Sequence, residues 1–397
     1  MFNQAMLRLG RNRSVIREIF EYSKQRAAAI GADKVFDFSI GNPSVPPPPQ
    51  VNETISRLLT EADPLLLHGY SSAQGDARVR EAVAGSIRRR FGAMIDKDDL
   101  YLTCGAAAAL AITLRAMCLP GDQVVLLAPF FPEYQVFVEA AGAEAVIVPA
   151  ERQNLQIDFD ALEARLDRRT RALIVNSPNN PSGVVLTREV LQKLCLLLLK
   201  KQEEYGHPIY LIADEPYREL VFDSEEPPYL PNMYDNSIVC YSYSKSLSLP
   251  GERIGYVAVP KSAAAHDDLY AAICGAGRAL GYVCAPSLFQ QVVAACVDVA
   301  PDIEAYRRNR DLLYGGLTEC GFRCVRPDGA FYLFMETPEP DANAFCEKAK
   351  EFELLLVPSD DFGCPGFVRI AFCVSEERIK ASLPAFRALA KSYGLCE

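Results

Sequence analysis

The middle of the chain, between residues 100 and 259, alternates short apolar runs with segments of helical pattern. The runs are rich in Val, Ile and Leu and show no polar alternation. They cover residues 100–104, 123–127, 145–148, 172–176, 209–213, 238–241 and 256–259. Strands that are apolar on both sides are typical of a parallel sheet covered by helices on both faces. The pattern therefore predicts an α/β fold with a mostly parallel, seven-stranded sheet between helices.

The segments between these runs predict the covering helices. They lie at residues 105–117, at 132–141, after Asp158, and from Thr187 to about Tyr205. Thr187 is a suitable N-cap, and Glu189 is favourable in the first turn because of the helix dipole.

Both ends of the chain depart from this alternation. The N-terminal part predicts one amphipathic helix over residues 15–29, and the proline run at 45–49 predicts a stiff extended connector. After about residue 300 we expect a helix around 306–310, strands at 322–325 and 330–335, and further helix and strand. We therefore predict a large domain over residues 50–290. Residues 1–49 and 291–397 are predicted to form a smaller α+β domain.

Composition and charge exclude several classes of function. The 51 acidic residues outnumber the 41 basic ones, and the formal net charge of −10 argues against a nucleic-acid binder, whose footprint is basic. It also gives no reason to expect a membrane partner. No apolar run reaches the roughly 18 residues of a membrane span, and no signal-peptide pattern opens the chain. A cytoplasmic location is expected.

The thirteen cysteines fall singly, and no pair has C-x-x-C spacing. With only three histidines, the sequence offers no metal-ligand cluster, so we predict no metal site. The thiols are interpreted as small buried apolar side chains in a reducing compartment.

A lysine ends one of the apolar strands, within Ser242-Tyr243-Ser244-Lys245-Ser246. An amine at such a point can form a Schiff base if its protonation is suppressed. Arg253, eight residues on, would suit a phosphate together with the hydroxyls of Ser242 and Ser244. The alternative is a surface lysine and arginine at a strand end.

Two other strands also end in polar residues. Asp214 follows the strand at 209–213, and open α/β sheets bind ligands at the carboxyl ends of their strands. Its carboxylate could hold a heterocyclic nitrogen protonated, and Tyr217 could bond a neighbouring ring oxygen. Asn180 lies in the Asn-rich segment 176–183 after another strand. The plain alternatives are a capping aspartate and an Asn-rich turn.

Together these segments resemble the fold-type I pyridoxal-phosphate (PLP) enzymes, specifically the class I/II aminotransferases. The resemblance extends from Gly41-Asn42-Pro43 to Arg369 and includes an S-x-S-K…P-G-x-R-x-G-Y signature around Lys245. It implies the PLP-dependent transferase fold and PLP as cofactor.

The resemblance implies roles around the cofactor ring. Lys245 matches the lysine that forms the Schiff base and then moves protons, and Asp214 matches the carboxylate that pairs with the pyridine nitrogen. Tyr217 and Asn180 match the donors to the phenolic oxygen, which lower the pKa of the Schiff base. Phe131 matches the ring that stacks on the cofactor, and the alternative is a core phenylalanine.

The resemblance also implies a phosphate site. Ser242, Ser244 and Arg253 match phosphate ligands, and Gly105-Ala106-Ala107 matches the loop that holds the phosphate at a helix N-terminus. Many relatives carry Ser or Thr where Ala106 stands, so more of the anchoring is expected to fall on Arg253 and on backbone amides.

Three further matches concern the substrate and the partner subunit. Arg369 matches the arginine that grips the substrate α-carboxylate in bidentate fashion, and Gly41 and Asn180 line the same pocket. Tyr70 matches the tyrosine that reaches the neighbouring subunit's phosphate. A homodimer with shared active sites follows from the resemblance.

The implied reaction is ping-pong transamination between an L-amino acid and a 2-oxo acid, with glutamate and 2-oxoglutarate as one pair. Aspartate, aromatic or branched donors stay open. In one branch, aspartate-specific members bind the distal carboxylate with a second arginine, donated by the partner subunit, at the position where Leu280 stands here. Arg278, Arg13 and Arg17 are candidates for a distal carboxylate, or are simply solvated arginines.

Two other functions fit the same residues. A PLP-dependent C–S β-lyase would use the same lysine, aspartate and arginine. An aminotransferase-like regulator would usually carry a basic winged-helix segment, and only about forty residues precede Gly41 here.

Overall fold

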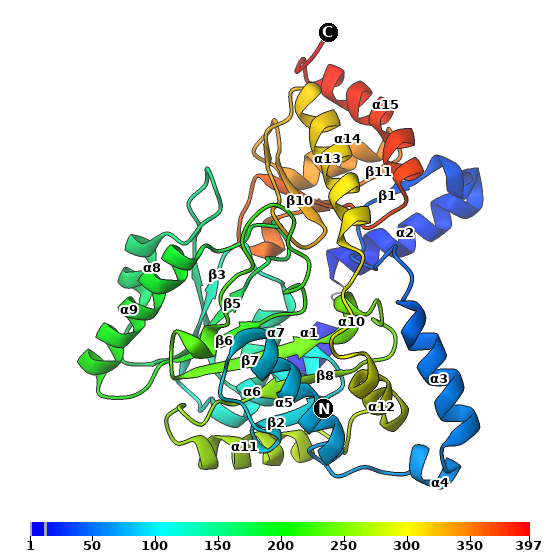
Figure 1. Cartoon of the computed structure of the whole chain (residues 1–397). Helices are drawn as coiled ribbons and strands as arrows, with labels where there is room; N and C mark the ends of the chain where they lie inside the picture. Colours follow the sequence, from blue (N-terminus) through cyan, green and yellow to red (C-terminus); the bar gives the residue numbers. More distant parts are fainter. Residues whose placement is uncertain (1, 12–13) are drawn as a thin grey trace.

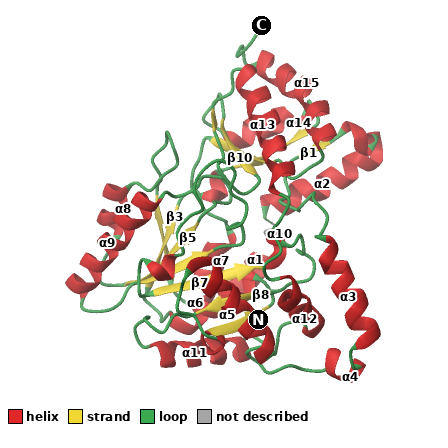
Figure 2. Cartoon of the chain, viewed as in Figure 1, coloured by secondary structure: helices red, strands yellow, loops and turns green. Residues whose placement is uncertain are grey.

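The computed structural model describes residues 2–11 and 14–397, and a seven-stranded sheet lies at its centre (Figures 1 and 2). The strand order is β2-β8-β7-β6-β5-β3-β4. Neighbours from β7 to β4 are parallel, whereas β8 runs antiparallel to both β7 and β2. The predicted mostly parallel sheet is confirmed. Its strands are β2 (Leu100–Thr103), β3 (Gln123–Leu127), β4 (Glu144–Val148), β5 (Thr170–Asn176), β6 (Tyr210–Asp214), β7 (Ser237–Ser242) and β8 (Gly255–Ala258).

Both faces of this sheet are buried, as the apolar runs predict. In β5, Ala172 and Ile174 pack into one core cluster, and Leu173 and Val175 pack into another. Because successive side chains point to opposite faces, each strand contributes to both clusters. Helices of one cluster are α5 (Ala77–Phe91), α8 (Phe159–Arg165), α9 (Arg188–Tyr205) and α12 (Ser287–Cys296). Helices of the other are α6 (Ala106–Met117), α7 (Glu133–Ala141) and α11 (His266–Ala279).

Element boundaries follow the predictions to within two residues. The side chain of Thr187 accepts a hydrogen bond from the Val190 amide, which confirms Thr187 as the N-cap of α9. Strand β5 begins two residues earlier than predicted, at Thr170, which pairs with Gln123 of β3. Polar residues at a strand end can form the backbone hydrogen bonds of the sheet although they interrupt the apolar run, so a prediction based on apolar runs misses them.

A second unit contains the antiparallel sheet β12-β13-β10-β9 and has its own apolar core (Figure 1). The short strand β1 (Phe36–Asp37) pairs in parallel with β11 (Leu354–Leu355) and so joins the N-terminal segment to this unit. The division into residues 50–290 and 1–49 with 291–397 stays a prediction. The other elements of this unit are β9 (Cys324–Val325), β10 (Tyr332–Glu336), β12 (Val357–Pro358), β13 (Phe367–Ala371), α13 (Ile303–Glu319), α14 (Ala342–Lys350) and α15 (Glu376–Ser392).

The N-terminal part holds two helices where the sequence predicts one. Helix α2 (Val15–Ile30) matches the prediction, and α1 (Gln4–Arg11) precedes it with no buried residue. The proline connector is shorter than expected because Pro49 starts α3 (Pro49–Glu61), since proline is well suited to the first helical position. Helix α4 (Pro64–Leu67) follows.

Within residues 2–11 and 14–397, no helix is long and apolar enough to cross a membrane. The same described ranges hold no group of three or more His, Cys, Asp or Glu side chains that could bind a metal ion. All thirteen cysteines are free thiols.

The sheet brings several polar strand ends to one edge. Strands β5, β6 and β7 are parallel neighbours, so Asn176, Asp214 and Ser242 end them at the same side, and Asn176 pairs directly with Asp214. Strand β8 runs the other way, so its first residue, Gly255, lies opposite Ser242. Ligands of open α/β sheets bind at such an edge.

Candidate active site

A cavity of about 300 Å³ lies at this edge and collects most of the predicted site residues. Residues of the large sheet, of the N-terminal segment and of β13 all line it. The predicted residues among them are Gly41, Ala106, Ala107, Phe131, Asn180, Asp214, Tyr217, Ser242, Ser244, Lys245, Arg253 and Arg369.

Lys245 is placed by α10 (Tyr243–Ser246), a short helix that begins directly after β7 and is capped by the side chain of Ser242. Its Nζ donates a hydrogen bond to the Gly41 carbonyl oxygen at 2.8 Å. Burial lowers the pKa of Lys245 to about 8, and the nearby Arg253 and Arg369 act in the same direction. A fraction of this amine is therefore uncharged near neutral pH, as a nucleophilic lysine requires.

Asp214 ends β6 and is 5% exposed. The Tyr134 hydroxyl donates to its Oδ2, whereas its Oδ1 is buried with no hydrogen-bond partner among the described residues. Burial raises the pKa of Asp214 to about 7, and the Tyr134 hydrogen bond offsets part of this rise. The side chain of Asn176 donates to the Asp214 backbone carbonyl at 2.8 Å and fixes the strand end. The open carboxylate oxygen calls for a donor or a cation from a ligand.

Arg369 lies on β13 and is 2% exposed. Its Nη1 donates to Asn180 Oδ1 at 3.1 Å, and its Nη2 donates to the Ser39 carbonyl. Its Nε is buried and has no partner in the described part of the chain. Burial lowers the pKa of this guanidinium. A buried cation with an open donor suits an anionic ligand group such as a carboxylate.

Arg253 closes the other end of the cavity, beside the start of α6. Its Nη1 lies 3.0 Å from the Pro250 carbonyl oxygen and 3.5 Å from Ser244 Oγ. Gly105 has a φ of +86°, which favours glycine, and a Cβ on it would lie 2.8 Å from Arg253 Nη2 and would displace that guanidinium. Ala106 and Ala107 are the first residues of α6 and line the cavity together with Arg253, and backbone amides at a helix start have no partner within the helix. This arrangement is that of an anion site.

Two tyrosines without a role in the sequence analysis also line the cavity. Tyr134 bonds Asp214, and the Tyr332 hydroxyl lies 2.9 Å from that of Tyr217. The sequence signal that could have identified Tyr332 is its position within the apolar run 330–335. A tyrosine buried in such a run usually needs a hydrogen-bond partner for its hydroxyl. Ile16 and Ile40, which add apolar surface, are further lining residues that the sequence did not indicate.

Several predicted residues lie elsewhere. Tyr70 is 91% exposed and lines a separate cavity of about 420 Å³ between α3 and α12. Arg278 on α11 and Arg17 on α2 are exposed, and neither lines the site cavity. Arg13 lies outside the described residues.

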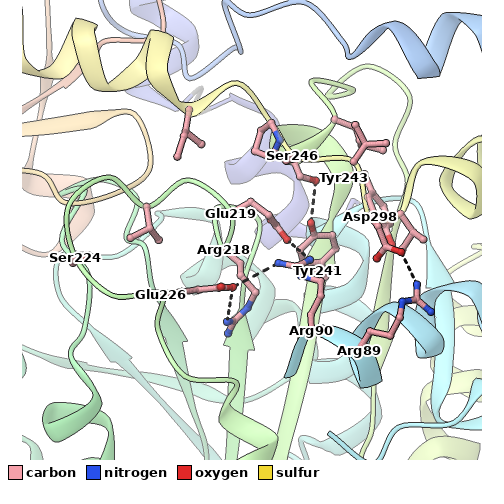
Figure 3. A pocket seen from close by; sticks show the side chains of 17 residues that line it. Arg89, Arg90, Arg218, Glu219, Ser224, Glu226, Tyr241, Tyr243, Ser246 and Asp298 are labelled. Carbon is pink, nitrogen blue, oxygen red and sulfur yellow. Dashed lines mark hydrogen bonds and ion pairs between the residues drawn. The ribbon is translucent and has the colours of Figure 1, made fainter. Parts of the chain in front are cut away.

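A second cavity, of about 630 Å³, lies near the end of α10 (Figure 3). Ser246 and Leu247 line it, and the Tyr241 hydroxyl donates to Ser246 Oγ at 2.9 Å. Its charged side chains pair with one another, as Arg90 does with Glu219 at 2.8 Å. Of the described residues predicted for the site, none lines this cavity, so its greater size does not make it the better candidate.

We expect Asp214→Asn to stabilise the ligand-free protein at pH 8. The pKa of Asp214 is about 7 in the folded state and about 3.9 in an unfolded chain, so between these values the folded state binds the extra proton. The free energy of unfolding should therefore fall as the pH rises from about 4 to 7, by up to about 4 kcal/mol.

Urea unfolding of both proteins between pH 4 and 8 measures this difference. The two should have similar stability near pH 4, diverge as the pH rises to about 7 and differ by a constant amount above it, whereas Asp160→Asn, at an exposed position, should follow the wild type. A pH-independent difference between Asp214→Asn and the wild type would contradict the burial of an uncompensated charge.

Comparison with known proteins agrees with this geometry. Residues 33–386 match the family described as Aminotransferase class I and II. An aspartate/prephenate aminotransferase of Thermus thermophilus is 32% identical over 87% of this chain and 88% of its own length. An arginine–pyruvate transaminase of Pseudomonas aeruginosa is 29% identical over 88% of both chains.

A solved aminotransferase structure from Eubacterium rectale has 56% sequence identity and a TM-score of 0.97 and covers 99% of both chains. The matched region contains every predicted cofactor and substrate residue, and the common fold extends over nearly the whole chain. The chain therefore belongs to the class I and II aminotransferases, which are pyridoxal 5′-phosphate-dependent enzymes.

Proposed function

We propose that the cavity around Lys245, Asp214 and Arg369 is the transamination site. One observation carries the proposal: a lysine with a lowered pKa, an unpartnered carboxylate oxygen and an unpartnered guanidinium nitrogen border a single cavity. Buried groups left open in this way are typical of functional sites.

The described residues fit PLP. Asp214 Oδ1 would receive the pyridinium N–H, and Tyr217 and Asn180 would donate to the ring oxygen. Phe131, which lines the same cavity, would stack on the ring. When bound, PLP supplies the electron sink that stabilises negative charge at the substrate Cα.

The phosphate would lie at the start of α6. Ser242, Ser244 and Arg253 offer two hydroxyls and a guanidinium, and the backbone of Gly105, Ala106 and Ala107 offers amides. Ala106 supplies no hydroxyl, so we assign more of the anchoring to Arg253 and the amides.

The substrate would be held and deprotonated by this chain's own side chains. Arg369 binds the α-carboxylate, with Gly41 and Asn180 beside it. Lys245 lies among them and carries the proton away from the substrate Cα. Its lowered pKa suits an acid–base group near neutral pH.

For the donor, we propose an amino acid with an apolar or aromatic side chain, exchanged in ping-pong fashion with the glutamate/2-oxoglutarate pair. Three described cations line the cavity, Lys245, Arg253 and Arg369, and each has a role above. Ile16 and Ile40 add apolar wall. The relatives named above act on aspartate and prephenate in one case and on arginine and pyruvate in the other, so similarity alone selects no donor.

Lys245→Ala should abolish the absorbance of the lysine–PLP Schiff base and lower turnover by more than about 10⁴-fold, because both the nucleophile and the proton carrier are lost. The measurements are an absorbance spectrum after reconstitution and turnover with glutamate. Lys200→Ala, at an exposed lysine, serves as control and should be normal. Near-normal turnover in Lys245→Ala would contradict the assignment.

A panel of donors, mixed with the loaded enzyme without any acceptor, ranks substrates directly through the loss of cofactor absorbance. We expect leucine and phenylalanine to react faster than aspartate, and Arg278→Ala to leave this order unchanged. Aspartate as the fastest donor would overturn the proposed donor class. Pyruvate release from cystathionine, faster than amino transfer, would favour a lyase.

We also propose a homodimer in which Tyr70 reaches the partner's phosphate site. Tyr70 is 91% exposed, and the neighbouring Leu65 and Leu66 are 85% and 82% exposed, an apolar patch suited to a protein partner.

The free thiols support a reducing, cytoplasmic setting.

Hybrid dimers of Tyr70→Phe and Lys245→Ala subunits test the shared site. Each hybrid should contain one fully wild-type site and bind PLP there with wild-type affinity, although the Tyr70→Phe homodimer binds it more weakly. Doubly tagged hybrids, isolated after co-expression, provide the sample. If the PLP-binding site of the hybrids keeps the weakened affinity of the Tyr70→Phe homodimer, Tyr70 does not act in the partner's site and the proposal is wrong.

A further inference from the structure

Tyr332, on β10, contacts both the proposed carboxylate-binding residue Arg369 and the proposed cofactor ligand Tyr217. It is 2% exposed, and the Arg369 guanidinium lies over its ring with the carbon 4.8 Å from the ring centroid. Its hydroxyl lies 2.9 Å from the Tyr217 hydroxyl. It also abuts Gly41, where a Cβ would lie 1.9 Å from the Tyr332 hydroxyl oxygen. Gly41 in turn holds Lys245 through its carbonyl.

The hydroxyl hydrogens decide which way the bond between the two tyrosines runs. Each hydroxyl has one hydrogen to donate. If Tyr217 gives its hydrogen to the ring oxygen of the cofactor, its own oxygen is free only to accept, so Tyr332 must be the donor to Tyr217. A hydroxyl that accepts a hydrogen bond is also polarised and becomes a stronger donor itself.

Arg369 therefore connects to both proposed donors of the ring oxygen. Its Nη1 donates directly to the amide oxygen of Asn180 at 3.1 Å. On the other side its guanidinium lies over the ring of Tyr332, whose hydroxyl bonds Tyr217. A carboxylate bound at Arg369 would partly neutralise the positive charge of the guanidinium. Because this charge lies over the Tyr332 ring, carboxylate binding changes the electrostatic environment of the Tyr332 hydroxyl.

We propose that Tyr332 is a positioning residue that holds the Tyr217 hydroxyl as a donor to the cofactor and links carboxylate binding at Arg369 to that donor. The proposal rests on the proposed function, since it takes Tyr217 as a ligand of the ring oxygen. Tyr332 itself needs no contact with the cofactor.

The test is the pH titration of the visible absorbance of the loaded enzyme, which reports the proton on the Lys245 nitrogen. A donor to the ring oxygen favours loss of this proton, so a weaker donor raises the midpoint. Tyr332→Phe should raise the midpoint by about 0.5 to 1 pH unit, the size expected for one neutral hydrogen bond, and Tyr217→Phe should raise it further. Adding Tyr332→Phe to Tyr217→Phe should then have no further effect, because the donor it supports is gone.

Propionate, a carboxylate without an amino group, probes the link to Arg369. Saturating propionate should shift the midpoint of the wild type, and Tyr332→Phe should reduce the size of that shift. Tyr234→Phe is the matched control, because this buried tyrosine also loses hydrogen bonds, to Ile209 and Gln202, but lies away from the cavity. It should leave the titration unchanged.

The outcomes separate the two proposals. A wild type without pH-dependent visible absorbance overturns the proposed site, and the role of Tyr332 with it. A normal wild type with an unchanged midpoint in Tyr332→Phe, or with an equal shift in the Tyr217→Phe background, overturns the role of Tyr332 alone. If Tyr332→Phe proves unstable by thermal unfolding, Gly41→Ala, which would push against the same hydroxyl, should raise the midpoint instead.

Discussion

Three ionisable side chains, the buried Asp214 and Arg369 and the half-buried Lys245, lie at one edge of the sheet, and much of the site is arranged around them. Burial of a charge costs free energy unless hydrogen bonds or an opposite charge compensate it. The pKa values of Asp214 and Lys245 respond by moving toward the neutral forms, to about 7 and about 8. Arg369 stays a cation and is held by Asn180 and the Ser39 carbonyl. The two buried faces of the sheet supply the packing that supports this edge.

The site forms only where separate parts of the chain meet. The large sheet brings Asp214 and Lys245, the antiparallel sheet brings Arg369, and the N-terminal segment brings Gly41. Backbone hydrogen bonds join the last two, since the Ala371 amide donates to the Phe38 carbonyl at 2.9 Å. A hydrogen bond of 2.8 Å, which Lys245 Nζ donates to the Gly41 carbonyl oxygen, then joins the N-terminal segment to the large sheet.

Much of the fold and most of the cavity could be predicted from the sequence, for a physical reason. Strands buried on both faces are apolar throughout, and polar residues directly after them must lie at the carboxyl edge, so Asp214 and Lys245 stood out. Tyr134 and Tyr332 did not, because their partners are 80 and 115 residues away along the chain. Helix α1 was missed as well. It spans only eight residues, which is shorter than the window of roughly 11 to 18 residues in which helical periodicity is recognised.

The sequence by itself determined the order of the strands along the chain, their burial on both faces and the identity of the polar residues that end them. These properties are local, because they depend on side-chain type and on chain order. Only the tertiary structure decided the protonation of Asp214 and Lys245, the open donor on Arg369 and the meeting of Tyr217 with Tyr332. These depend on distances between segments far apart in the chain and on the exclusion of water, which no local pattern encodes.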